Sequence, residues 1–117
     1  MAGKMVAEDP QGAEGHRIMA LALWKQRDYD GCLAECAMAL NADQNSTAML
    51  ALQSIALWQD GRRKDAQKSY RDAAKADPKV GTADVFCRLL LCDAHDISIV
   101  SDFLRKNRWV LAPPNQP

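Results

Sequence analysis

Four cysteines and two histidines are the side chains here with the broadest chemistry, because thiolates and imidazoles bind metals and act as nucleophiles or redox groups. Cys32 and Cys36 form a C-x3-C pair, and Cys87 and Cys92 form a C-x4-C pair. Compact zinc sites use C-x2-C pairs, so neither spacing matches. Free cysteine is also among the most buried residue types. We therefore expect packing roles and no metal ligand, and a Cys-based metal or redox protein is the least favoured alternative.

The histidines do not stand in a recognisable catalytic setting. His95 lies in a polar turn, and His16 falls near the start of the first predicted helix. Three motifs are missing from the sequence: G-x4-G-K-[ST] and G-x-G-x-x-G, which bind phosphates, and H-E-x-x-H of zinc proteases. The sequence therefore predicts no catalytic residue, no cofactor and no enzymatic activity.

Composition indicates which elements must position these side chains. The chain has 117 residues, 15 basic and 15 acidic side chains, and only 6% aromatic residues within a hydrophobic share of 48%. Balanced charge provides no long-range attraction to nucleic acid or to an anionic membrane, so neither is an expected partner. The many alanines favour closely packed helices. No apolar run is long enough for a signal peptide or a membrane span, so a cytoplasmic location is expected.

An internal repeat organises most of the chain. Each repeated segment reads as a helix, a short polar turn, a second helix and a polar stop, with Gly61 in the second turn suited to a left-handed conformation. The repeat has an offset of 34 residues and is carried by the pairs Ala22 and Ala56, Leu23 and Leu57, Trp24 and Trp58, Ala39 and Ala73, Ala42 and Ala76, and Asp43 and Asp77.

The repeat predicts a single domain over residues 13–111, with units at about 13–46, 47–80 and 81–111. Residues 1–12 are expected to be a flexible start and 112–117 a loose tail. The third unit is degenerate: Thr82 is predicted to cap a helix over 84–93, and a last helix is predicted over 97–107. Such a unit is typical of the cap at the end of a repeat array.

The period and several residues resemble those of the tetratricopeptide repeat (TPR) family, over about residues 13–80. The resemblance is carried by the KQRDYDGCLAECAMALNAD run and by Ala39, Ala66, Tyr70, Ala73 and Pro78. Cys32, Cys36 and Gln44 depart from the family pattern. The resemblance implies a small stand-alone TPR protein with an all-α fold, in which antiparallel helix pairs stack as a short right-handed α-solenoid.

Stacked helix pairs of this kind form a concave groove lined mainly by the first helix of each pair. Two tryptophans one repeat apart would lie along it, although tryptophan at helical spacing also packs in cores. By the resemblance, the protein-binding groove consists of Arg17, Leu21, Trp24, Lys25, Ala51, Ile55, Trp58, Gln59, Val85 and Leu89.

The function expected from this groove is that of an adaptor, a TPR-like protein-protein interaction module that binds an apolar or amphipathic protein segment. Leu21 and Ile55 stand where receptors of chaperone tails have asparagines, which disfavours that role. One alternative is a dedicated chaperone of a bacterial secretion or assembly subunit. Another is a self-assembling scaffold, a homodimer whose third unit or tail would hide Phe103, Trp109 and Leu111.

Overall fold

The fold was analysed in a computed structural model, which describes residues 13–111. The prediction of an all-α protein is confirmed for this range, which contains no strand. The predictions for 1–12 and 112–117 lie outside the described residues. The elements are α2 (Ala13–Lys25), α3 (Tyr29–Ala42), α4 (Thr47–Gln59), α5 (Arg63–Ala76), the 3-10 turn η1 (Pro78–Gly81), α6 (Ala83–Leu90), α7 (Ala94–Asn107) and the 3-10 turn η2 (Arg108–Leu111).

Local sequence signals define the first four helices. The side chain of Asp28 accepts a hydrogen bond from the amide of Gly31 at the start of α3, and Ser46 does the same for Met49 at the start of α4. Gly61 adopts a φ of 87°, which confirms the left-handed turn between α4 and α5. The polar turns between α2 and α3 and between α4 and α5 were predicted from their residue types, whereas the cap at Ser46 was not.

The third unit departs from its predicted boundaries. Thr82 caps α6 as expected, but the helix ends at Leu90 because Leu91 adopts a left-handed φ of 53°. The next helix begins at Ala94, three residues earlier than predicted, because Asp93 and Asp96 form a reciprocal capping box. This short turn sets the direction in which α7 leaves α6.

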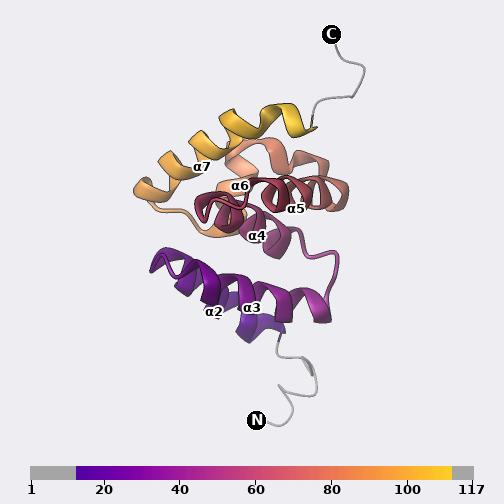
Figure 1. Ribbon diagram of the computed structural model, residues 1–117, viewed down its shortest axis with the longest axis vertical. Coiled ribbons are helices and arrows are strands. Elements are labelled where there is room, and N and C mark those ends of the chain that lie inside the picture. Colours follow the sequence, from indigo (N-terminus) through magenta and orange to yellow (C-terminus); the bar gives the residue numbers. More distant parts are fainter. Residues whose placement is uncertain (1–12, 112–117) are drawn as a thin grey trace.

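The helices stack along the long axis of the molecule. In Figure 1, α2 and α3 form the lowest layer, α4 and α5 lie above them, and α7 crosses the top beside α6. Each hairpin is closely packed, and α4 contacts both α3 and α6. Within the range 13–111 no helix is both long enough and apolar enough to cross a membrane.

An aromatic cluster joins the third unit to the second. The ring centroid of Phe103 in α7 lies 5.4 Å from that of Trp58, 5.2 Å from Tyr70 and 5.5 Å from Phe86. These rings come from α4, α5, α6 and α7, and their tilted or edge-on geometry is the favourable one for aromatic pairs. Phe103 is therefore already covered within the chain.

Candidate functional site

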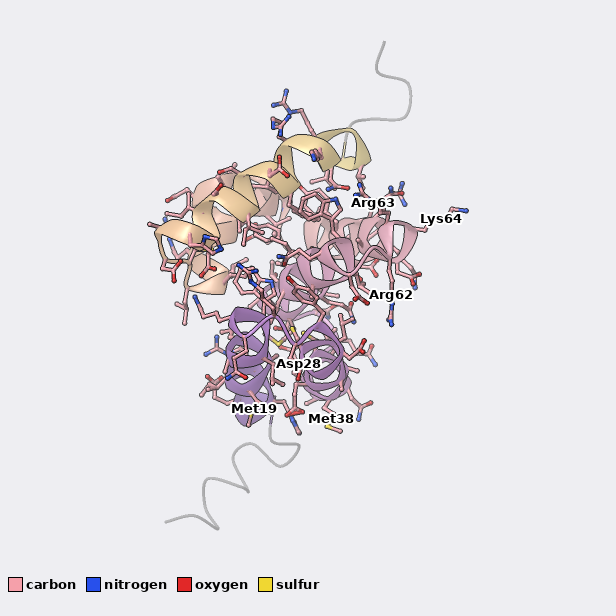
Figure 2. The ribbon with its side chains drawn as sticks, turned by 60° about the vertical axis from the view of Figure 1, so that its left-hand side comes forward. Met19, Asp28, Met38, Arg62, Arg63 and Lys64 are labelled. Carbon is pink, nitrogen blue, oxygen red and sulfur yellow. The ribbon has the colours of Figure 1, made fainter. Side chains whose placement is uncertain are left out.

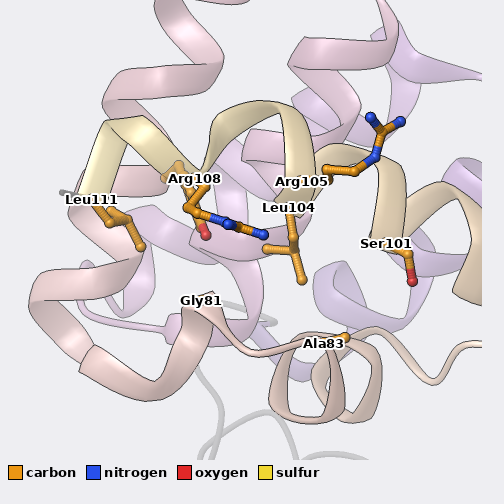
Figure 3. A pocket seen from close by; sticks show the side chains of 8 residues that line it. Gly81, Ala83, Ser101, Leu104, Arg105, Arg108 and Leu111 are labelled. Carbon is orange, nitrogen blue, oxygen red and sulfur yellow. The ribbon is translucent and has the colours of Figure 1, made fainter.

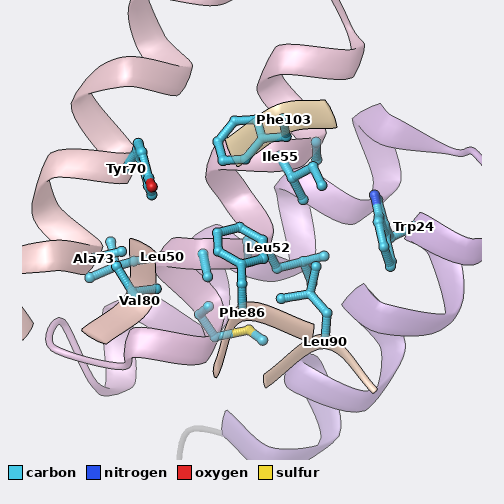
Figure 4. Packing of buried hydrophobic residues seen from close by; sticks show 14 of the residues in the cluster. Trp24, Leu50, Leu52, Ile55, Tyr70, Ala73, Val80, Phe86, Leu90 and Phe103 are labelled. Carbon is cyan, nitrogen blue, oxygen red and sulfur yellow. The ribbon is translucent and has the colours of Figure 1, made fainter. Parts of the chain in front are cut away.

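Four of the predicted groove residues are core residues. Leu21 and Trp24 are only 6% and 3% exposed, and Ala51 and Ile55 are fully buried. Figure 4 shows Trp24 and Ile55 in the same packed interior as Phe103. The expectation that Trp24 faces an open groove is therefore wrong, because elements from elsewhere in the chain cover its ring.

The start of α7 and the turn before it contact the end of α2, next to Trp24 in the sequence. Lys25, at the end of α2, donates from Nζ to the Asp96 carboxylate at 2.6 Å and to the carbonyl of Leu91 at 3.0 Å. Beside this contact, a guanidinium nitrogen of Arg27 lies 3.3 Å from Nε2 of His95. These contacts hold the third unit against the first, so the predicted groove is filled by the chain itself.

A second polar bridge links the first two units beneath α7. The indole Nε1 of Trp24 donates to Oε1 of Gln59 at 2.6 Å, and Nε2 of Gln59 donates to the hydroxyl of Tyr29 at 3.1 Å. A hydrogen bond from a buried indole N–H satisfies this donor and also fixes the position of the ring. Trp24 and Gln59, both predicted for the groove, thus form a structural junction between helices α2 and α4.

Trp58 remains half-buried at the same junction. Its ring packs edge-on against Phe103, and the charged groups of Arg63 and Lys106 each lie 5.9 Å from its centroid. The Nε1 atom of Trp58 is the one buried side-chain nitrogen or oxygen of the described residues that has no hydrogen-bond partner. Trp58 therefore serves mainly as a packing surface for α7.

The remaining predicted groove residues are dispersed. Arg17 pairs with Glu14 on its own helix, at 3.2 Å from its Nε, and is half-buried. Val85 and Leu89 lie on α6 and are also half-buried, with Leu89 packed against the core. Arg17 thus lies on α2, whereas Val85 and Leu89 lie on α6, the helix that contacts α4 and α7.

Sequence reasoning missed a different apolar surface, on the outside of the first helix pair. Met19 in α2 is 49% exposed and Met38 in α3 is 52% exposed. Figure 2 shows both methionines at the lower edge of the molecule, away from the other helices. The signal was present in the sequence, since apolar residues occupy the face of each helix opposite its buried stripe.

The cysteines split into two buried and two half-buried thiols. Cys32 and Cys36 are fully buried in the core, as predicted, and Cys87 and Cys92 are half-buried. The pKa of Cys36 is raised by its hydrogen bond to Cys32 and by burial. Burial and a hydrogen bond to Cys87 raise the pKa of Cys92 to about 12. Both thiols therefore stay protonated and poorly nucleophilic at neutral pH.

Metal binding finds no support in the arrangement of potential ligands. Among residues 13–111, no three histidine, cysteine, aspartate or glutamate side chains gather closely enough to hold a metal ion. No family model, curated protein or solved structure matches the chain.

Proposed function

We propose that this chain is a small TPR-like interaction module, a short right-handed α-solenoid that binds an amphipathic helix of another protein. Support comes from the 34-residue period and from the paired helices α2 with α3 and α4 with α5. Balanced charge makes a protein a better partner than nucleic acid or a membrane. The raised thiol pKa values of Cys36 and Cys92 make these two thiols poor nucleophiles, and we propose a non-enzymatic role for the module in the cytoplasm.

One observation carries the proposal: the outer face of the first helix pair is apolar. We define this outer face by its exposed side chains, Ile18, Met19, Ala22, Ala34, Ala37 and Met38. The end of a stacked array needs a polar surface to remain soluble alone. Methionine, which adapts its shape to a partner, is over-used at protein-binding surfaces. On this proposal, the outer face is the surface on which a partner helix continues the stack.

A polar pair joins the two helices that carry the outer face. His16 Nδ1 lies 3.2 Å from a carboxylate oxygen of Glu35, which joins α2 to α3. Met19 follows His16 by three residues and Met38 follows Glu35 by three, so each methionine lies about one turn from this pair. An arriving helix would place apolar side chains on the two methionines and a polar one near the pair.

The geometry favours a helix as the occupant. Two antiparallel helices leave a shallow groove between their ridges, and the small side chains of Ala22, Ala34 and Ala37 would let another helix approach closely. The chain already shows this type of packing at its other end, where α7 inserts Val100 and Phe103 into the core. An amphipathic helix with large apolar residues on one face is the matching partner.

Photocrosslinking from the outer face tests the proposal. A photoreactive residue placed by Met19→p-benzoylphenylalanine should give one adduct with another protein in the native cell. The adduct should disappear when Met38→Asp is added. It should persist with Ile97→Asp, a matched control that removes a side chain 48% exposed elsewhere on the molecule. The absence of an adduct, or one that is insensitive to Met38→Asp, would contradict the proposal.

Self-assembly is the second candidate, and the same face supports it. Phe103 is fully buried, so the third unit does not require a second copy to cover it. The outer face could instead pair with itself across a twofold axis, since such an interface is self-complementary. An adduct with the mass of two copies would identify this case. A heavier adduct whose partner is a secretion or assembly subunit would identify the dedicated chaperone.

A further inference from the structure

A pocket of about 500 Å³ lies at the end of the molecule opposite the outer face. Its walls come from five elements, α5, η1, α6, α7 and η2, which meet where the chain turns back after the second unit. The volume falls in the range of small-molecule sites. Figure 3 shows Gly81 and Ala83 along one side and Leu104, Arg108 and Leu111 along the other.

Tyr70 supplies a hydroxyl group without a partner at this pocket. The residue is only 2% exposed, and its ring packs edge-on against Phe86 and Phe103. No described residue hydrogen-bonds the Tyr70 hydroxyl. Among the described residues, Trp58 Nε1 is the one side-chain nitrogen or oxygen that is both fully buried and without a partner. The Tyr70 hydroxyl oxygen is therefore in contact with solvent. Burial raises the pKa of Tyr70 to about 12, so the hydroxyl remains a hydrogen-bond donor at neutral pH.

The charged groups around the pocket favour a negative ligand. Arg108 is exposed and forms no ion pair with the described part of the chain, and Figure 3 shows its side chain extending along the pocket wall toward Leu104. Arg105, also on the wall, is already paired with Asp102. No carboxylate of residues 13–111 lines the pocket, and the nearby Asp84 is bound to Arg88 at 2.7 Å. The guanidinium of Arg108 therefore faces the cavity without a competing anion from these residues.

Glycine keeps the pocket open beside the tyrosine. A Cβ atom placed on Gly81 would lie 3.4 Å from the Tyr70 hydroxyl oxygen and 3.3 Å from Cδ1 of Leu111. Any side chain at this position would therefore enter the space next to the hydroxyl. The φ of Gly81 is not positive, so another residue can adopt this backbone conformation without strain. A substitution at Gly81 therefore acts by filling the pocket.

We propose that this pocket binds the carboxylate of a ligand with a compact apolar body. Arg108 pairs with the carboxylate, the Tyr70 hydroxyl donates to the same group, and Leu104 and Leu111 contact the apolar part. A single unpaired cation beside apolar walls suits a monoanion better than a phosphate, which is best bound by several cations. A free organic acid and the C-terminus of a peptide both present this chemistry.

Titrations followed by amide NMR test the proposal with benzoate as the free acid and N-acetyl-leucine as the mimic of a peptide terminus. Benzoate should shift the amides of Gly81, Ala83 and Arg108 saturably, with a Kd of about 1–10 mM, as expected for so small a ligand. Benzamide, which lacks the charge, should bind far more weakly. Tighter binding of N-acetyl-leucine would assign the pocket to peptide termini, and tighter binding of benzoate to free acids.

Variants locate the binding groups within the pocket. Arg108→Gln and Tyr70→Phe should each weaken benzoate binding, the first by at least about tenfold, because a charge-assisted bond is lost. Gly81→Val should block the pocket. Arg71→Gln, which removes an equal charge from an exposed position on α5, should leave binding unchanged. The proposal is overturned if no shift saturates, if Arg71→Gln matches Arg108→Gln, or if benzamide or inorganic phosphate binds as well as benzoate.

Discussion

Nζ of Lys25 donates a hydrogen bond of 2.6 Å to Oδ2 of Asp96, a residue 71 positions further along the chain. The lysine side chain is 36% exposed and the aspartate side chain only 9%. Asp96 also accepts from the amide of Asp93 in the capping box. One carboxylate thus fixes both the start of α7 and the contact between the third unit and the first.

Removing the lysine should therefore loosen α7. For Lys25→Met we expect the free energy of unfolding to fall by about 1–3 kcal/mol, because a mostly buried carboxylate loses its charged partner. Urea denaturation measures this loss of stability. In hydrogen exchange, Lys25→Met should raise the amide exchange rates in α7 more than those in α3. Arg17→Met is the matched control, since its pair with Glu14 is exposed and worth less than about 1 kcal/mol. Equal losses for both variants would contradict this role of Lys25.

Truncation of Trp24 should unfold much of the protein and not only weaken binding. We expect Trp24→Ala to lower the free energy of unfolding by about 3–5 kcal/mol, because a core ring and its hydrogen bond to Gln59 are lost. Met19→Ala, at an exposed site, should change it by less than about 0.5 kcal/mol. Circular dichroism during urea titration distinguishes the two. If Trp24→Ala leaves the free energy of unfolding unchanged, Trp24 is not a core residue and the prediction that it faces an open groove would stand.

Stability should fall at alkaline pH. The folded protein holds Cys36 with a pKa raised above the usual 9.0, so above pH 9 the unfolded thiol loses its proton while the folded one keeps it. The unfolded state then binds fewer protons, and the free energy of unfolding falls by up to about 1.4 kcal/mol per pH unit for this group. Cys92 and Tyr70, whose pKa values are also raised, act in the same direction.

Urea denaturation at pH 8, 9 and 10, with a reductant present, measures this slope. Cys36→Ala should make the dependence shallower, because the titrating thiol is removed from both states. A free energy of unfolding that stays constant to pH 10 would show that these thiols ionise equally in the folded and unfolded protein.

Two glycines provide a matched pair for backbone effects. Gly61 has a φ of 87°, and a Cβ atom added there would meet no other atom within 4 Å. Gly61→Ala should therefore lower the free energy of unfolding by about 1 kcal/mol through backbone strain alone. Gly15 in α2 has equal space and an ordinary helical conformation. Gly15→Ala should raise the free energy of unfolding by up to about 1 kcal/mol. Thermal denaturation should show opposite shifts, and shifts of the same sign would contradict the argument.

The helices and turns of the first two units could be predicted from sequence because their causes are local. Asp28 and Gly61 act on an amide or a dihedral angle within a few residues, and Thr82 acts in the same way at the start of the third unit. The 34-residue offset repeats the helix pattern but not these residues, since Arg62 stands at the position equivalent to Asp28 and Arg27 at the position equivalent to Gly61. The buried state of Cys32 and Cys36 likewise follows from residue type and helical spacing. Two boundaries of the third unit were predicted wrongly. Leu91 is a left-handed non-glycine residue and gives no sequence signal, whereas the capping box of Asp93 and Asp96 was overlooked.

The surface that remains available for binding was decided by tertiary structure. The repeat pattern places Trp24 and Trp58 at equivalent positions, yet Trp24 is buried and Trp58 is half-buried. Their environments differ because of α7, which lacks the repeat residues. Phe103 of α7 packs on Trp58, and Asp96 of α7 pairs with Lys25, the residue after Trp24. A local pattern cannot encode a contact across 71 residues. The sequence alone determined the helices and turns of the first two units, and long-range packing determined which of their side chains stay exposed.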